Sequence, residues 1–162
     1  TRRVRRRAAL TAAGCALAVA VLGGLSTDIG PWYASLRRPA WQPSDAWFGP
    51  VWTALYALCA LSGTMAWRAA PTATARQTLL LAWALNAFLN VAWSLLFFRL
   101  RRPDWALLEV GLLWASIAAL VVLSARHRRA AGALLLPYLA WVSFAAVLNR
   151  EIVRLNGPFG GP

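Results

Sequence analysis

The sequence predicts an all-α membrane protein, a bundle of five transmembrane helices. Hydrophobic residues make up 60% of its 162 residues, and the mean hydropathy is +0.54, whereas about half the residues of a soluble domain are apolar. All 17 basic residues are arginine, and they gather in short clusters separated by long uncharged runs. Lipid, rather than water, is therefore the expected solvent for most of the chain.

Five uncharged or nearly uncharged runs have the length of membrane spans. A helix needs about 20 residues to cross a hydrocarbon core of about 30 Å. The longest connection between the runs is the segment 28–45, which leaves no room for a second domain, so residues 1–162 are expected to form a single transmembrane domain. The expected spans cover about residues 8–29, 46–67, 77–98, 105–125 and 130–152.

The distribution of arginine predicts an orientation. Ten arginines fall at the N-terminus and in the second and fourth connections, against seven on the other side, so the positive-inside rule places the N-terminus in the cytoplasm. The open alternative is a cleaved signal peptide made of the basic residues 2–7 and the apolar run that follows them. The net charge of +12 does not indicate nucleic acid, because the arginines flank spans instead of sharing one face.

The segment 28–45 is predicted to be an ordered lid or interfacial belt. It contains three prolines, which disfavour a regular helix, and three aromatic residues suited to a membrane interface. The preceding span carries small residues every fourth position, which either allow close helix packing or reflect an alanine-rich composition. These small residues are Ala8, Ala12, Ala16, Ala20 and Gly24.

Aromatic and amide side chains share helical faces within three spans. Residues at i and i+4 point to the same side of a helix, and amides inside hydrocarbon are costly unless they are paired or face a cavity. Either a binding pocket or plain packing with interhelical hydrogen bonds would explain the pattern. The residues are Phe48, Trp52, Tyr56, Cys59 and Gly63 in the second span, Asn86, Asn90, Trp93 and Phe97 in the third, and Trp141, Ala145 and Leu148 or Asn149 in the fifth.

Catalytic and metal-binding groups are scarce. The single histidine, His127, lies within the basic cluster 126–129, and neither a metal-ligand set nor a nucleophile–base pair can be built from it. The five acidic residues fall near span ends, where they are expected to pair with arginines. The chain is therefore not expected to be an enzyme, unless it acts through tryptophan or a bound ligand.

Several separated motifs resemble the tryptophan-rich sensory protein and translocator protein (TspO) family, also called the peripheral benzodiazepine receptor family. The resemblance covers essentially the whole chain, in the family's order. The motifs are Trp32-Tyr33-x-x-Leu36-x-x-Pro39-x-Trp41-x-Pro43, Val51-Trp52-x-x-Leu55-Tyr56, Leu85-Asn86-x-x-x-Asn90-x-x-Trp93-Ser94-x-x-Phe97-Phe98, Pro137-Tyr138-x-x-Trp141-x-x-Phe144-Ala145, Leu148-Asn149 and Arg154-Leu155-Asn156.

The resemblance implies a five-helix bundle of a bacterial cell membrane that forms a homodimer, with a pocket beneath the loop between the first two helices. Family ligands are porphyrins, haem, isoquinoline and benzodiazepine drugs and, in animals, cholesterol. Trp52 and Trp141 match tryptophans linked in some relatives to light-dependent porphyrin breakdown. Carried over by position, the pocket residues are Tyr33, Pro43, Trp52, Asn86, Asn90, Trp93, Trp141 and Ala145.

One departure argues against cholesterol. The family's sterol motif needs a tyrosine between Leu148 and Arg154, and Arg150 stands in its place. The leading interpretation is a membrane sensor or transport-related protein that binds a porphyrin or haem as its ligand and requires no other cofactor. The alternative is a light-dependent porphyrin-degrading enzyme that uses Trp52 and Trp141. An ion-coupled transporter has less support, because no intramembrane charge pair marks an ion path.

Overall fold

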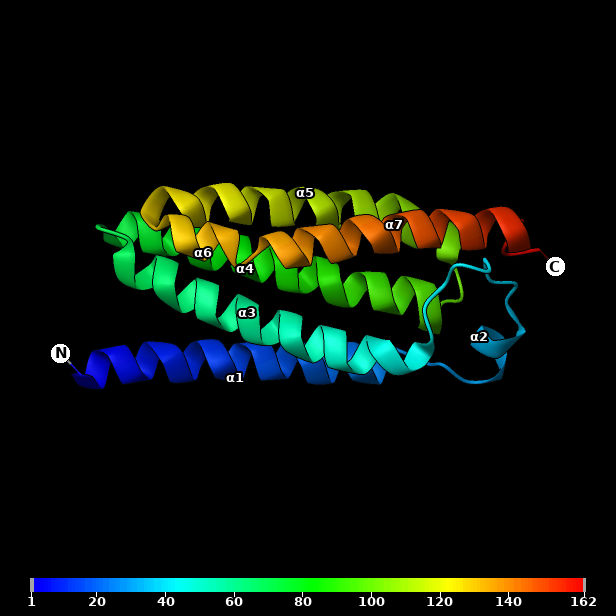
Figure 1. The fold of residues 1–162 in the computed structure, drawn as a ribbon, viewed down its shortest axis with the longest axis horizontal. Helices are drawn as coiled ribbons and strands as arrows, with labels where there is room; N and C mark the ends of the chain where they lie inside the picture. Colours follow the sequence, from blue (N-terminus) through cyan, green and yellow to red (C-terminus); the bar gives the residue numbers. More distant parts are fainter. Residues whose placement is uncertain (1, 162) are drawn as a thin grey trace.

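The computed structural model describes residues 2–161, and these residues form helices and connections without a β-strand. The predicted all-α class is confirmed. In chain order the elements are α1 (Arg2–Ser26), α2 (Pro31–Ser35), the 3₁₀ turn η1 (Asp45–Trp47), α3 (Phe48–Ala69), α4 (Ala73–Ser94), the π-helical turn η2 (Leu95–Arg99), α5 (Pro103–His127), α6 (Arg129–Ala133) and α7 (Leu136–Asn156) (Figure 1).

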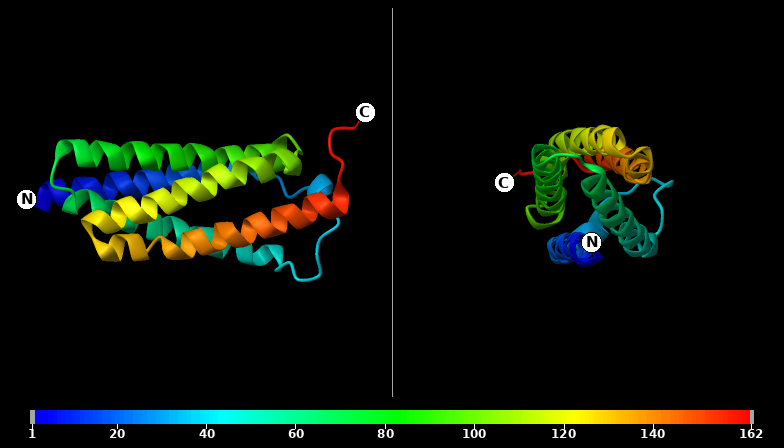
Figure 2. Two further views of the ribbon diagram at one scale, coloured as in Figure 1. Left: turned by 90° about the horizontal axis from the view of Figure 1, so that it is seen from above. Right: turned by 90° about the vertical axis from the view of Figure 1, so that its left-hand side faces the viewer.

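The long helices lie side by side along one axis. Helix α1 packs against α3 and α4, and α5 packs against α4, α6 and α7. The first and last described residues lie at opposite ends of the bundle, and α2 lies at the end where α7 finishes (Figures 1 and 2). We call this the lid end, because the segment 28–45 folds over it.

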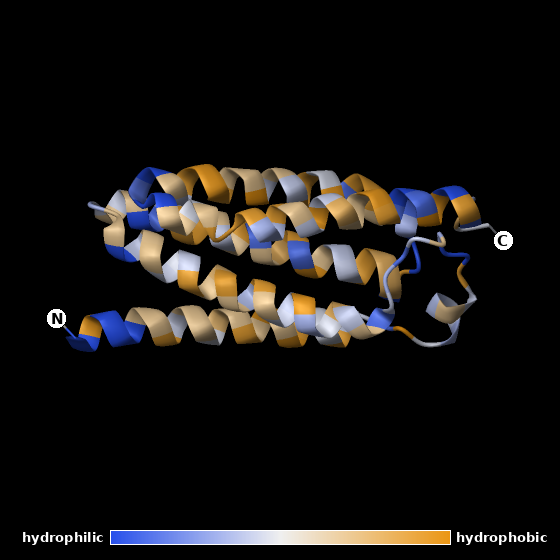
Figure 3. Ribbon diagram, viewed as in Figure 1, coloured by the Kyte–Doolittle hydropathy of each residue, from blue (hydrophilic) through white to orange (hydrophobic). Residues whose placement is uncertain are grey.

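Within residues 2–161, four helical segments are long and apolar enough to cross a membrane: Arg2–Ser26, Ala73–Arg99, Pro103–His127 and Arg129–Asn156. Hydrophobic residues run along the middle of the bundle, and hydrophilic residues gather towards its two ends (Figure 3). These features indicate an integral membrane protein. Helix α3 has 22 residues but is not one of these four segments, so the predicted fifth crossing is not confirmed.

Three local differences from the predicted elements have backbone causes. Helix α1 begins at Arg2 instead of residue 8, because arginine is a good helix former and the helix continues through the basic cluster. The last predicted span, 130–152, is split into α6 and α7 ahead of Pro137, which has no N–H to donate. Conversely, Pro31 begins the short helix α2, because a proline fits the first helical turn.

Hydrogen bonds between side chains and neighbouring helices join the bundle. Ser62 of α3 donates its Oγ proton to the carbonyl of Ala131 in α6 at 2.6 Å. The indole N–H of Trp114 in α5 donates to Ser143 Oγ of α7 at 2.8 Å. In lipid, packing and such bonds drive helix association, because lipid tails are as apolar as the side chains.

Gly132 marks a close approach between α6 and α5. A Cβ atom at this position would lie 2.6 Å from Ala125 Cβ and 2.8 Å from the carbonyl oxygen of Val121. Gly111, also in a long apolar helix, has no atom within 4 Å of the equivalent position. The close packing therefore needs glycine at position 132 and does not need it at position 111.

We expect Gly132→Ala to destabilise the protein and Gly111→Ala to leave its stability unchanged. Overpacking a close-packed contact costs about 1–3 kcal/mol, which should lower the midpoint of thermal unfolding followed by circular dichroism in detergent. Equal midpoints for the two variants would show that α6 does not lie against α5 as described.

Candidate functional site

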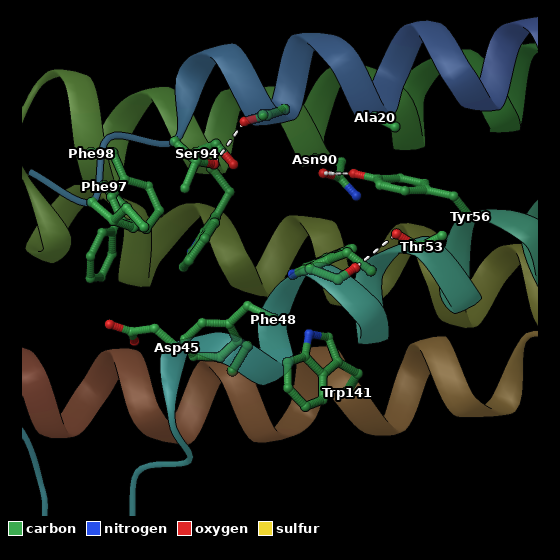
Figure 4. Close-up of a pocket in the computed structure, with 18 of the residues that line it drawn as sticks. Ala20, Asp45, Phe48, Thr53, Tyr56, Asn90, Ser94, Phe97, Phe98 and Trp141 are labelled. Carbon is green, nitrogen blue, oxygen red and sulfur yellow. Dashed lines mark hydrogen bonds between the residues drawn. The ribbon is translucent and has the colours of Figure 1, made fainter.

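A cavity of about 730 Å³ lies inside the bundle at the lid end, between α1, α3, α4 and α7 (Figure 4). Its size falls in the range of small-molecule sites, about 300–1,000 Å³. Its walls are mainly apolar and aromatic. The lining residues are Ala13, Ala16, Leu17, Ala20, Gly23, Gly24, Thr27, Ile29, Tyr33, Asp45, Phe48, Gly49, Trp52, Thr53, Tyr56, Ala57, Ala60, Asn90, Trp93, Ser94, Phe97, Phe98, Trp141, Phe144, Ala145, Leu148, Asn149 and Ile152.

Aromatic rings from α3, α4 and α7 form much of the wall. Trp52 and Tyr56, one turn apart on α3, have ring centroids 5.6 Å apart. The ring of Trp93 stacks on Phe97 of η2, with centroids 5.2 Å apart and an interplanar angle of 29°. These rings offer flat apolar surfaces and fixed edges to a bound molecule.

The edge of Trp141 also meets a ring from another helix. Its centroid lies 6.0 Å from that of Phe48, which begins α3, at an interplanar angle of 69°. Trp141 lies one turn before Ala145 on α7, and both residues line the cavity. Side chains of α3 and α7 therefore meet across the cavity wall through this aromatic pair.

The side-chain amides of Asn86 and Asn90 in α4 form hydrogen bonds within the bundle. Asn90 donates to the Tyr138 hydroxyl at 2.9 Å and accepts a bond from Tyr56 at 3.4 Å (Figure 4). Tyr138 in turn donates to Asn86 at 3.3 Å, and Asn86 donates to Ser116 of α5 at 3.1 Å. Asn90 thus lines the cavity with its polar atoms already paired, while Asn86 is buried outside the lining.

A second amide fixes the orientation of Trp93. The indole N–H of Trp93 donates to Asn149 Oδ1 of α7 at 3.1 Å, and Asn149 Nδ2 donates to the carbonyl of Pro103 at 2.9 Å. Asn149 was not among the predicted pocket residues. Its position on the predicted polar and aromatic face of the last span is the sequence signal that could have identified it.

A polar cluster closes the cavity at the lid end. Tyr33 is 4% exposed, donates its hydroxyl proton to Asp45 Oδ1 at 3.0 Å, and accepts a bond from Gln42 at 3.1 Å. Arg38 pairs with Asp45 Oδ2 at 3.1 Å. Burial first, and then the bond to Asp45, raise the pKa of Tyr33 to about 12. The Tyr33 hydroxyl therefore stays protonated and continues to donate at neutral pH.

The segment 28–45 is also attached to other elements. The Asn156 side chain accepts a bond from the Arg37 N–H at 2.7 Å and donates to the Arg37 carbonyl at 2.8 Å. The ring of Trp41 packs edge-on against Phe144 of α7, with centroids 5.8 Å apart. The segment therefore covers the cavity with an ordered structure that is tied to the end of α7.

The structure brings six of the eight predicted pocket residues to one cavity and leaves out Asn86 and Pro43. Three further features of the wall were not among the predicted pocket residues: the phenylalanines, of which Phe48 and Phe97 lie on the predicted aromatic faces, the hydroxyls of Thr53 and Ser94, and the small residues of α1. The small residues of α1 are visible in the sequence, but their spacing alone indicates either close helix packing or an alanine-rich composition, and neither predicts a cavity wall. The six residues are Tyr33, Trp52, Asn90, Trp93, Trp141 and Ala145.

Comparison with known proteins agrees with the arrangement of motifs. The chain is 36% identical over 148 residues to the tryptophan-rich protein TspO of Chlorobaculum tepidum, covering 88% of this chain and 92% of that protein. It is 34% identical over 131 residues to the translocator protein of Homo sapiens, covering 80% and 78%. It is 37% identical over 125 residues to a tryptophan-rich sensory protein of Cereibacter sphaeroides, covering 77% of each. Because the model of the TspO/MBR family also matches residues 11–155, this chain belongs to that family.

Proposed function

We propose that this membrane protein binds a tetrapyrrole, a porphyrin or haem, in the cavity at the lid end, and that it acts as a sensor or transport-related protein. The observation that carries the proposal is a cavity of about 730 Å³ with tryptophans from three different helices in its wall. A planar ring system can stack against such walls. Two of the relatives are named translocator protein and tryptophan-rich sensory protein, which supports a transport or sensory role.

The polar groups of the wall favour a ligand that is mostly apolar. Asn90 and Asn149 have partners within the bundle. Among the described residues that line the cavity, Asp45 carries the one charged side chain, and it is paired with Arg38. The deep part of the cavity therefore suits a hydrophobic ring, and the polar edge of the ligand belongs near the lid end.

A second candidate is a porphyrin-degrading enzyme driven by light. It is favoured by one observation: Trp52 and Trp141 line the same cavity, so both indoles would lie against one bound ring. Dark and illuminated incubations separate the two functions. A binding protein quenches porphyrin fluorescence stoichiometrically in both, whereas a degrading enzyme consumes the porphyrin under light.

The proposed topology has five crossings with α3 as the fifth. Its 22 residues span about 33 Å at 1.5 Å per residue, and it packs against α1 among the apolar helices. The N-terminus is proposed to lie in the cytoplasm of a bacterial cell, and the arginine bias of ten against seven supports the cytoplasmic side. A homodimer is proposed from the family resemblance.

The five-crossing topology is tested by reporter fusions at the two termini. Because five is odd, fusions before residue 2 and after residue 161 should report different compartments. Finding both reporters on one side would contradict the five-crossing proposal. Deletion of α3 should remove one crossing and bring both reporters to the same side. Reporters that stay in different compartments after this deletion would also contradict the proposal.

For the cavity, we expect Trp52→Ala and Trp141→Ala to weaken protoporphyrin binding about tenfold or more. The loss combines about 0.5–1.5 kcal/mol of aromatic contact with about 25 cal/mol per Å² of apolar contact. The measurement is a titration followed by quenching of tryptophan fluorescence in detergent.

The matched control is Trp67→Ala, at the other end of α3, where the ring contacts Arg76 and does not line the cavity. This variant should bind as the parent does, and circular dichroism should show equal helicity in all variants. If both cavity variants bind like the parent while Trp67→Ala fails, the aromatic faces serve packing and the assignment of the pocket is wrong.

Cholesterol is proposed not to bind specifically, because Arg150 replaces the tyrosine of the sterol motif. Residue 150 is exposed on α7, so Arg150→Tyr should be tolerated and should increase sterol binding if the motif has the meaning assigned to it. Saturable binding of a labelled sterol to the unmodified chain would refute the proposal.

A further inference from the structure

The arginines are divided unequally between the two ends of the bundle. Seven arginines and four acidic residues lie at or near the lid end, and the fifth acid, Glu109, lies in the lid-side half of α5. The opposite end has ten arginines. The formal charges are thus 7 − 5 = +2 and 10 − 0 = +10, which add to the +12 of the chain. We call the opposite end the basic pole; it consists of Arg2, Arg3, Arg5, Arg6, Arg7, Arg68, Arg76, Arg126, Arg128 and Arg129 (Figure 3).

The charge of the basic pole is not neutralised within residues 2–161. Every arginine of the pole is exposed except Arg76, which is half-buried over the ring of Trp67. The side-chain bonds recorded there reach backbone carbonyls, from Arg68 to Arg5 and from Arg76 to Trp67. The ion pairs of the described residues all lie at the lid end: Arg38–Asp45, Arg102–Asp104 and Arg154–Glu151.

These arginines lie next to the apolar stretches of their helices, where lipid headgroups would meet the protein. Arg7 directly precedes the uncharged run 8–27, and Arg126 directly follows the uncharged run 110–125. Because α1 is helical from Arg2 onwards, successive arginines point in different directions and surround the helix. Arginine buries its apolar stem and keeps its guanidinium group at the polar boundary. The basic pole therefore forms a collar around the edge of the apolar bundle.

We propose that the basic pole binds the phosphate headgroups of anionic phospholipids in the surrounding leaflet. The guanidinium group matches phosphate with two parallel hydrogen bonds, and clusters of four to eight basic residues next to membrane spans attract anionic lipid. The first turn of α1 contains no acidic residue, so the positive end of its dipole adds to the attraction. Lipid phosphates reach the collar within the membrane plane, which favours lipid over a soluble polyanion.

The test compares lipids in contact with the full chain in phosphatidylcholine vesicles. Electron paramagnetic resonance of spin-labelled phosphatidylglycerol and phosphatidylcholine measures the fraction of each lipid immobilised by the protein. We expect a preference of several-fold for phosphatidylglycerol, weakened by salt because these charges are exposed. The variant Arg126→Gln/Arg128→Gln/Arg129→Gln should lower that preference about threefold or more.

The matched control removes the same charge from the lid end. Arg37, Arg101 and Arg150 are exposed, and their triple substitution by glutamine should leave the preference near that of the parent. Equal losses in both triple variants would assign the effect to net charge and overturn the proposal. Equal immobilisation of the two lipids by the parent would also overturn the proposal.

A short DNA duplex added to the same vesicles tests the competing partner. If the parent binds the duplex through the three arginines of the variant and shows no lipid preference, the basic pole recognises nucleic acid and the proposal is overturned. Circular dichroism of both triple variants, with helicity equal to that of the parent, shows that lost binding is not lost folding.

Discussion

The hydrogen bonds between Tyr138 and the amides of α4 are the interaction on which the walls of the cavity depend. Inside a bilayer no water is available to polar groups, so an amide without a partner would be costly. Tyr138 bonds to both Asn86 and Asn90 and thereby fixes the beginning of α7 against the middle of α4. Eleven residues later, Asn149 accepts the bond from Trp93 and fixes α7 again. Between these two points Trp141 faces the cavity from a helix whose position is determined at both ends.

The space between those walls exists because α1 contributes small side chains. Ala16, Ala20 and Gly24 lie one turn apart and line the cavity, where larger residues would fill it. Protein interiors are close-packed and leave few voids larger than a water molecule. The chain therefore maintains a cavity of this size. Small side chains of α1 line one wall, and aromatic side chains of α3, α4 and α7 line the other walls.

The sequence was sufficient for the all-α class and for most of the aromatic wall, because the spacing of four residues sets which side chains share a face. The sequence was not sufficient to tell that Asn90 lines the cavity and Asn86 does not, because the two residues lie one turn apart on the same face. Which of them reaches the cavity depends on the contact of Asn86 with Ser116 of α5. Pro43 was carried over from the family motif, but the course of a loop depends on distant contacts. One such contact joins Asn156 to the backbone of Arg37.

The partners of the acidic residues could also be predicted only in part from their positions in the sequence. Asp45, Asp104 and Glu151 pair with arginines close to them in sequence, as expected. Asp28 instead accepts a bond from the N–H of Gly30. Glu109 has both carboxyl oxygens buried and without a hydrogen-bond partner among the described residues. Its position a few residues inside α5 separates it from the arginines at the helix end, and sequence distance alone did not reveal this.

Several polar and amphipathic side chains of α3 lie in the cavity wall or at a contact with another helix. Trp52, Thr53 and Tyr56 face the hollow, and Ser62 bonds to α6, so the residues that reduce the apolar character of α3 point into the bundle. A hydropathy average treats all faces of a helix alike, although lipid meets only the outer one. An average over the whole of a helix that lines a cavity therefore does not describe the face that lipid would meet. The same residues of α3 thus shape the cavity wall and join α3 to α6.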